Sequence, residues 1–344
     1  MEKYLLGVDG GNTKTDYLLC TEDGKFVDVY RAGTCSHEQC DDGYDGMERM
    51  MKEQLSILLT RNGIGVSDIV SAGFGLAGAD LPGQLKELRK RVESIGFTQY
   101  GLSNDGILGI KGASSSGIGL CAVNGTGTVV IGVDEKGSIL QIGGVGPLSG
   151  DTAGGMYIVG QIISALYKFY YRCGEDSAMF PHVMDLLGAE IDELLTVVSD
   201  YRPLFARSVD IIQIGAKAAI DGDAVAKSIF DNVGIYIGQG AAGCIRRLSF
   251  AGLGTAEAPI DIVQVGSIWH KVPYQGMNSA FLQTVQTLSG KVCRTINLNA
   301  PAAVGGVLWA KEIAGGKPVT ENYRKSVLEA ISTDKYEALV FQSN

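Results

Sequence analysis

The stretch Val8-Asp9-Gly10-Gly11-Asn12-Thr13-Lys14-Thr15 places two adjacent glycines between the apolar runs 4–8 and 16–20. Two strand-like runs joined by a short glycine-rich turn predict a β-hairpin. A similar arrangement recurs at Val123-Asn124-Gly125-Thr126-Gly127-Thr128, again between two apolar runs. The match is one of layout and not of exact letters. It predicts two halves of similar design.

The first of these loops has the chemistry of a polyphosphate site. Gly10, Gly11 and Thr13 expose consecutive N–H groups with little obstruction, and the Thr13 hydroxyl and Lys14 add donors. Asp9 would hold Mg²⁺ through water, because this ion keeps much of its hydration shell. A plain tight hairpin is the alternative, since Gly-Gly and Asn are common in turns. Because a strand follows the loop, the sequence excludes a Walker A or dinucleotide-binding fingerprint, in which a helix follows.

Composition predicts a protein with a large core. The chain has 344 residues, of which 45% are hydrophobic, and this length favours two domains. Its 29 basic and 38 acidic residues give a net charge of −9 without any basic block, which argues against a nucleic-acid or anionic-membrane partner. No apolar run approaches the roughly 20 residues of a membrane span, and the N-terminus lacks a signal-peptide pattern, so we expect a cytoplasmic protein.

Cysteine and histidine usage narrows the chemistry further. The seven cysteines show no paired CxxC spacing, and several lie in apolar runs, which predicts reduced buried thiols. There are three histidines. This argues against structural zinc, a histidine-based metal site or a Ser-His-Asp hydrolase.

Hydrophobic periodicity predicts alternating strands and amphipathic helices. The strands are predicted at residues 4–8, 16–21, 26–32, 69–76, 100–103, 119–123, 129–133 and 260–265. The helices are predicted at residues 47–59, 82–95, 157–170, 208–220, 224–248, 303–313 and 322–338. The order β-β-β-α-β-α-β restarts near Ile118, and the small-residue stretch 111–117 is the predicted boundary between the halves.

These loops, together with later stretches, resemble the BadF/BadG/BcrA/BcrD ATPase family, and within it the N-acetylglucosamine kinase branch of the actin, hexokinase and Hsp70 superfamily. The resemblance covers nearly the whole chain. It implies an α/β fold of two ribonuclease-H-like (actin-like ATPase) domains, each with a mixed five-stranded sheet flanked by helices, and a nucleotide cleft between them. The implied domains are residues 1–114, completed by a C-terminal helix at about 316–344, and residues 115–315.

The resemblance also assigns residues to ATP. Residues 9–15 are similar to the first phosphate loop, 125–127 to the second, 265–269 to the glycine loop beside adenosine, and 216–223 to a stretch that encloses the nucleotide. The implied ATP-binding residues are Gly10, Gly11, Asn12, Thr13, Lys14, Gly125, Thr126, Gly127, Ala218, Gly266, Ser267 and Trp269. Trp269 is interpreted as packing against the base, with an interface aromatic as the alternative.

Asn104-Asp105-Gly106 stands where kinases of this family carry their catalytic aspartate at a strand end. Phosphoryl transfer needs an oriented nucleophile, charge neutralisation and exclusion of water. The resemblance therefore implies that Asp105 accepts the proton of an acceptor hydroxyl. An Asx turn or a helix N-cap is the alternative role for this residue.

A second group of residues is implied for the acceptor sugar. Residues 143–151 resemble the segment that lines the sugar pocket, and Asp151 there is interpreted as a sugar ligand or as the N-cap of the following helix. Val145 replaces an aromatic residue of the family pattern, and Ala77 replaces a serine near the acetamido group. The implied substrate-contacting residues are Asn104, Asp105, Ala77, His37, Gly144, Val145 and Asp151. For His37, a polar surface loop is the alternative.

The resemblance thus implies an ATP- and Mg²⁺-dependent kinase that phosphorylates a hydroxyl of an amino or N-acetylamino sugar, working as a homodimer. The alternative is an ATPase that activates a partner enzyme, as other members of this family do. Such activators hold an iron–sulfur cluster between subunits with cysteines. The cysteines of this chain do not follow that pattern.

Overall fold

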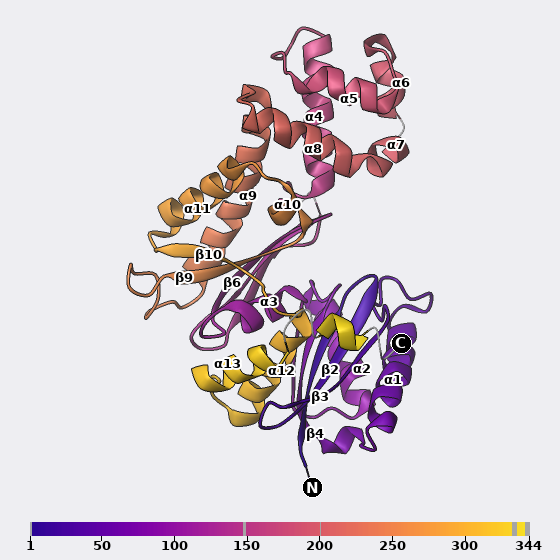
Figure 1. Ribbon diagram of the computed structural model, residues 1–344, viewed down its shortest axis with the longest axis vertical. Helices are drawn as coiled ribbons and strands as arrows, with labels where there is room; N and C mark the ends of the chain where they lie inside the picture. The colour runs from indigo at the N-terminus through magenta and orange to yellow at the C-terminus, as the bar shows by residue number, and fades with distance from the viewer. Residues whose placement is uncertain (1, 147–148, 200, 332–335, 341–344) are drawn as a thin grey trace.

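The computed structural model describes residues 2–146, 149–199, 201–331 and 336–340 (Figure 1). The strands are β1 (Tyr4–Gly10), β2 (Lys14–Thr21), β3 (Phe26–Gly33), β4 (Ile69–Leu76), β5 (Tyr100–Ser103), β6 (Gly119–Asn124), β7 (Thr128–Val133), β8 (Ile139–Gly143), β9 (Ile260–Val265) and β10 (Cys293–Asn297). The α-helices are α1 (Gly43–Arg61), α2 (Pro82–Ile95), α3 (Gly106–Ala113), α4 (Gly155–Tyr170), α5 (Met179–Leu187), α6 (Leu194–Ser199), α7 (Tyr201–Ala206), α8 (Ser208–Ile220), α9 (Ala224–Arg247), α10 (Ser267–Lys271), α11 (Gln275–Ser289), α12 (Ala302–Gly315) and α13 (Glu321–Ala330).

Within these residues the strands form two five-stranded sheets of the same topology, β3-β2-β1-β4-β5 and β8-β7-β6-β9-β10. In each sheet the first three strands in the chain are antiparallel neighbours, and the last two join in parallel. The predicted pair of mixed five-stranded sheets is confirmed. The central strands are apolar on both faces, and Leu5, Leu6 and Val8 of β1 are fully buried, because helices cover both sides of the sheet.

Two helices cross between the halves. α3 follows β5 of the first sheet but packs on the second, where Ile107 and Ile110 share a core with Ile131 of β7. α12 follows β10 of the second sheet but packs on the first, where Val307 shares a core with Leu5 of β1. Each half therefore supplies one helix to the other.

The crossing depends on glycines that allow backbones to touch. A Cβ atom added to Gly305 of α12 would lie 2.1 Å from the Leu108 carbonyl oxygen of α3. One added to Gly7 of β1 would lie 2.1 Å from the Ala303 carbonyl oxygen, and one on Gly73 of β4 would lie 2.3 Å from the Gly306 carbonyl oxygen. No side chain fits at these contacts, so the small-residue composition of α12 follows from its position.

The packing bears on the predicted domain boundaries at 114 and 315. The predicted boundaries assign α3 to the first half and α12 to the second. In the structure, α3 packs on the second sheet and α12 packs on the first. We propose that the polypeptide passes from one half to the other near residue 105 and again near residue 301. α13 packs beside α12, as its Val327 shows. Of the predicted helix 322–338, residues 332–335 lie outside the described ranges, and residues 336–340 are helical.

A helical extension rises from the second sheet and is formed by α4 to α8 (Figure 1). Its core contains Ile158, Ile162, Phe180 and Ile211, all at most 3% exposed. Periodicity predicted α4, α8 and α9 here but named neither α5 to α7 nor the edge strands β8 and β10. In the described ranges, no helix is long and apolar enough to cross a membrane.

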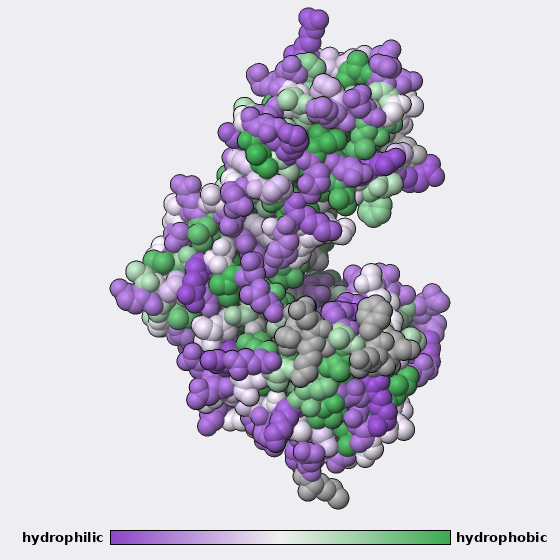
Figure 2. All heavy atoms as spheres, in the orientation of Figure 1, coloured by the Kyte–Doolittle hydropathy of each residue, from purple (hydrophilic) through white to green (hydrophobic). Residues whose placement is uncertain are grey.

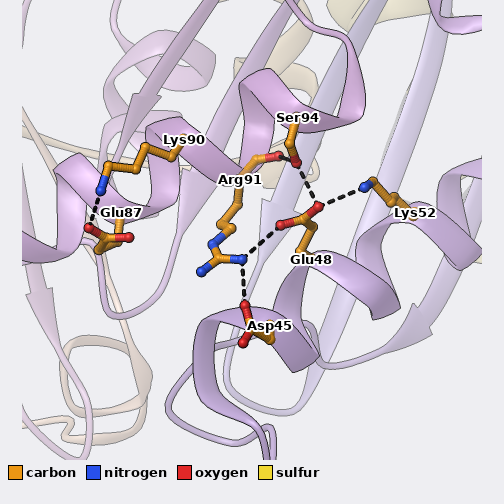
Figure 3. A network of polar contacts seen from close by, with 7 residues as sticks. All are labelled: Asp45, Glu48, Lys52, Glu87, Lys90, Arg91 and Ser94. Carbon is orange, nitrogen blue, oxygen red and sulfur yellow. Dashed lines mark hydrogen bonds and ion pairs between the residues drawn. The ribbon is translucent and has the colours of Figure 1, made fainter.

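On the outer surface of the first half, an ion-pair network joins α1 to α2 (Figure 3). The Arg91 guanidinium contacts Asp45 at 2.5 Å and Glu48 at 3.0 Å, and Glu48 also accepts from Lys52 at 2.6 Å and Ser94 at 2.7 Å. These hydrogen bonds lower the pKa of Glu48 to about 2. Because these ion pairs are accessible to solvent, they contribute little to the free energy of unfolding. Their main effect is to orient α1 against α2.

A deep notch separates the helical extension from the first half (Figure 2). The carboxyl ends of β1, β4 and β6 are directed toward it (Figure 1). Loops that follow parallel strands at one edge of a sheet are the usual location of ligand sites in such folds.

The helix contact yields a first prediction. We expect Gly305→Ala to destabilise the protein by about 1–3 kcal/mol, because the new methyl group overlaps the Leu108 carbonyl. The matched control in the same helix is Gly315→Ala, whose methyl group meets only Lys317 at 3.9 Å. Urea denaturation measures both. Equal midpoints for the two variants would contradict the proposed role of Gly305.

Candidate functional site

Strand topology brings the predicted catalytic residues to one edge of the first sheet. Asp9 lies near the end of β1, Ala77 follows β4, and Asn104 and Asp105 follow β5. These strands are parallel neighbours in the order β1-β4-β5. The Ala77 N–H also donates to the Gly10 carbonyl at 2.7 Å, which ties the two loops together.

Asp9 occupies an environment suited to a bound cation. Burial, followed by the negative charges of Asp105 and Asp16, raises the pKa of Asp9 to about 7. Asp16 is already neutralised by Arg31 at 2.6 Å and Lys14 at 3.1 Å. A divalent cation would relieve the repulsion at Asp9, and Mg²⁺ held with nucleotide phosphates and water needs few carboxylates. The residues present therefore fit Mg²⁺ at Asp9.

Asp105 lies at the N-cap position of α3, but its side chain makes no capping hydrogen bond. The neighbouring Asn104 takes a turn-forming role instead, since its Oδ1 accepts from the Gly106 N–H at 3.0 Å. Burial and the charge of Asp80 raise the pKa of Asp105 to about 6, against the opposing effect of nearby N–H groups. The carboxyl group thus titrates near neutral pH, where a general base operates.

Asp80 is a site residue that the sequence analysis did not name. Its Oδ1 accepts from Asn104 Nδ2 at 2.8 Å, and also from Gln141 Nε2 of β8 at 2.6 Å. Since Gln141 belongs to the second sheet, this carboxylate joins the two halves across the cleft. It also orients Asn104 beside the candidate base.

The first phosphate loop is a tight hairpin whose tip is exposed. The Gly11 N–H donates to the Lys14 carbonyl at 2.9 Å, so this predicted phosphate donor is used within the hairpin. Asn12, Thr13 and Lys14 are exposed at the tip. The Thr34 hydroxyl donates to the Gly11 carbonyl at 2.8 Å and so holds the loop in place.

The second loop has a similar geometry. The Gly125 N–H donates to the Gly127 carbonyl at 3.0 Å, which leaves Thr126 and Gly127 exposed at the tip. The Gly155 N–H at the start of α4 holds the loop at the Gly125 carbonyl, 2.8 Å away. A Cβ on Gly266 would lie 2.3 Å from the Asn124 carbonyl oxygen. The predicted adenosine loop therefore contacts the base of the second phosphate loop.

Trp269 is held by the protein itself. Its indole Nε1 donates to the Ala122 carbonyl at 2.9 Å, and its ring packs edge-on against Phe281 at 5.2 Å. These two contacts fix the Trp269 ring in the segment that follows β9, and stacking on the base stays a prediction. Ser267 is exposed beside it, and Ala218 is buried in α8.

The acceptor-side residues lie around Asp80. His37 is half-buried and stacks on Tyr44 at 4.3 Å, and a Cβ on Gly78 would lie 2.6 Å from its ring. Burial lowers the pKa of His37. From the second half, a Cβ on Gly144 would lie 3.3 Å from Asp80 Oδ1.

Asp151 makes its hydrogen bonds to residues that precede it closely in the sequence. The Asp151 carboxylate accepts from the Gly146 N–H at 2.5 Å and from the Ser149 hydroxyl at 3.3 Å. It does not cap α4, whose N-cap is Gly154, so the alternative interpretation of Asp151 as a cap is wrong. Val145, in the same stretch of sequence, is 53% exposed. Its side chain is free to meet a ligand or solvent.

Comparison with known proteins gives the family. The sequence profile of the BadF/BadG/BcrA/BcrD ATPase family matches residues 6–310. The chain belongs to the BadF/BadG/BcrA/BcrD ATPase family. The matched range contains both glycine loops and both sheets except the first two residues of β1, and the family resemblance expected from the sequence is confirmed.

The individual relatives of this ATPase family member share at most about a quarter of their aligned residues with the chain. A curated N-acetylmuramic acid/N-acetylglucosamine kinase of Clostridium acetobutylicum is 24% identical over 230 residues, which cover 66% of this chain and 74% of that protein. A candidate N-acetylglucosamine kinase of Chromobacterium violaceum is similar in structure, with a TM-score of 0.59 and 21% identity over 90% of this chain and 99% of the other. A ROK family glucokinase of Streptomyces griseus, solved with glucose and AMPPNP, has a TM-score of 0.50 and 14% identity over 91% and 100% of the two chains. These two structures share the fold.

The raised pKa of Asp9 yields a second prediction. A carboxyl group with a raised folded-state pKa stabilises the fold at low pH, and this contribution is lost as pH rises from 3.8 toward 7. At about 1.4 kcal/mol per unit, we expect Asp9→Asn to stabilise the metal-free protein by on the order of 2–4 kcal/mol above pH 7.

The same variant should lose its advantage near pH 4 and gain no stability from Mg²⁺ with ADP. The exposed Asp41→Asn serves as a control for removal of one negative charge. Thermal denaturation across this pH range measures both. A stability gain that does not change with pH would contradict the assignment.

Proposed function

We propose that this ATPase family member is a kinase that transfers the γ-phosphate of ATP to a hydroxyl group of an amino or N-acetylamino sugar. The observation that carries the proposal is the placement of Asp105. A half-buried carboxyl group whose pKa is raised to about 6 follows β5, with β4 between it and the β1 hairpin, at the edge where the second half also contributes Gln141. A carboxylate in this position suits an acceptor hydroxyl.

In the proposed reaction, Asp105 takes the proton of the acceptor hydroxyl as its oxygen attacks the γ-phosphate. The Asn104 side chain donates a hydrogen bond to Asp80, which fixes its orientation next to Asp105. Closure of the cleft excludes water, which would otherwise compete as the acceptor. Asp105 then releases the proton to solvent when the cleft opens.

The phosphates are proposed to lie between the two hairpin tips. N–H groups at Asn12 and Thr13, with Lys14, face one side, and those at Thr126 and Gly127 face the other. Asp9 would hold Mg²⁺, which neutralises charge on the phosphate oxygens when bound. Asp16, held by Arg31 and Lys14, gives the first tip a fixed base.

The acceptor region favours a sugar without an acidic substituent. Asp80 is oriented by Asn104 and Gln141, Glu38 is exposed nearby, and burial disfavours the charged form of His37. A carboxylate on the sugar would meet repulsion here, whereas an amine or acetamido group would not. We therefore propose hexosamines and N-acetylhexosamines as acceptors in preference to N-acetylmuramic acid, which the name of the Clostridium relative also includes.

A homodimer and a cytoplasmic location complete the proposal. The end of α4 exposes three tyrosines, Tyr167, Tyr170 and Tyr171, whose exposed fractions are 37–46%. Aromatic residues of this kind are enriched at subunit interfaces. The cytoplasm supplies ATP and Mg²⁺.

A third prediction tests the reaction. We expect ADP release from Mg-ATP only when a hexosamine or N-acetylhexosamine is present, and Asp105→Asn to lower kcat by about 10²- to 10⁴-fold with nucleotide binding retained. The exposed Asp192→Asn is the control. Hydrolysis that is independent of every sugar would favour the alternative, an ATPase that activates a partner enzyme.

A fourth prediction concerns Asp80. Its charge contributes to the raised pKa of Asp105, so kcat should fall as pH drops below about 6 in the wild type. In Asp80→Asn we expect this acidic limb to move to lower pH by up to about one unit, with a raised KM for the sugar because Asn104 loses its partner. An unchanged limb would contradict the coupling of these two carboxylates.

A further inference from the structure

A cavity of about 370 Å³ opens where the two crossing helices meet the second sheet. It is lined by Lys111 of α3, Glu312 of α12, and the turn that includes Lys136. Lys317, which follows α12, completes the rim. The turn lies at the end of β7, so the cavity and the phosphate loops are at opposite ends of strands of six residues, which is roughly 20 Å.

The floor of this cavity holds more positive than negative charge. Lys111 pairs with Glu312 at 2.5 Å, and both side chains are buried. Arg324 of α13 is 5% exposed and donates through Nη1 to the Lys111 carbonyl. Its Nη2 lies 3.9 Å from Glu312 Oε1, beyond hydrogen-bond distance. Two buried cations thus share one carboxylate.

This charge is not satisfied by hydrogen bonds within the described part of the chain. Arg324 Nε and Nη2 are buried without a hydrogen-bond partner, as is Glu312 Oε1. Gly117, with φ of 71°, packs directly against this group, since a Cβ there would lie 2.7 Å from Glu312 Oε1 and 2.9 Å from Arg324 Nη2. Burying a charge without compensation is costly. Burial accordingly lowers the pKa of Arg324 and raises that of Glu312.

Two acidic residues of the turn, Asp134 and Glu135, also line the cavity, and both carboxylates hold backbone N–H groups. Asp134 accepts from three backbone N–H groups, those of Lys136, Ser138 and Ser249, at 2.8–3.1 Å. Glu135 accepts from the Gly252 N–H at 2.7 Å. Both carboxylates are therefore used to hold the turn. Lys136 and Lys317 are exposed at the rim, and no ion pair of either is formed among the described residues.

From these contacts we infer that the cavity is a binding site for a phosphate-class anion, either inorganic phosphate or the phosphate group of a small phosphomonoester. Lys111 lies at its floor, and the exposed Lys136 and Lys317 line its rim. Arg324 supplies the uncompensated positive charge behind the floor. The net charge of the chain is −9, so general attraction of anions does not explain binding here.

An anion in this position would connect α3, α12 and the turn after β7. These are the elements through which the two halves are joined, and bound ligand would stabilise that junction. The inference does not depend on the proposed kinase reaction. The cavity lies at the end of the second sheet opposite to the phosphate loops, and binding is measured by thermal stability.

The test measures thermal stability against the concentration of inorganic phosphate, with Mg-ADP saturating the nucleotide site. We expect phosphate to raise the Tm of the wild type, and Lys136→Gln/Lys317→Gln to weaken its apparent affinity about tenfold or more, as loss of charge-assisted contacts does. Exposed lysines are chosen because replacing Lys111 or Arg324 alters the buried pair and endangers folding.

Lys86→Gln, an exposed lysine on α2, is the matched control and should respond to phosphate as the wild type does. Glucosamine 6-phosphate is titrated in parallel, and binding that is tighter than that of phosphate and is weakened in the rim variant would identify a phosphomonoester as the ligand. Equal phosphate responses of the rim variant and the wild type would overturn the inference, as would the absence of any response in the wild type.

Discussion

The contact between α3 and α12 is the constraint on which the rest of this structure depends. Each helix is connected to one half and packed on the other, and Gly305 meets the Leu108 backbone where they cross. Because the crossing fixes the two sheets relative to each other, the hairpins after β1 and β6 are held at one notch (Figures 1 and 2). A bulkier residue at this point would separate the two loops that we propose bind one nucleotide.

The cleft concentrates negative charge that a ligand is needed to neutralise. Asp9 and Asp105 both have pKa values raised by burial and by neighbouring carboxylates, to about 7 and about 6 respectively. The protein neutralises Asp16 internally with Arg31 and Lys14 and leaves Asp9 for a cation. Perturbed carboxyl groups of this kind are typical of catalytic sites. In the proposed reaction, Asp9 would hold Mg²⁺ with the nucleotide, and Asp105 would accept the proton of the acceptor hydroxyl.

Much of this arrangement could be predicted from the sequence. Glycine turns between apolar runs indicated both hairpins, and periodicity located β4, α2 and β5, which carry the site, because these signals are local. Asp80 was not found, since its role depends on Gln141, which lies 61 residues further along and in the other sheet. The capping interpretation of Asp151 was wrong because Gly154 occupies the N-cap position of α4. The helix exchange was also missed, since periodicity shows that a helix has an apolar face but not which sheet covers it.

The central claim is that both halves act on one phosphoryl group and deliver it to a sugar. ³¹P nuclear magnetic resonance of a reaction containing Mg-ATP and glucosamine or N-acetylglucosamine tests it directly, because it identifies the product that carries the phosphate. The account predicts ADP together with a sugar phosphomonoester, formed in equal amounts. Inorganic phosphate as the product, with the sugar unchanged, would contradict it.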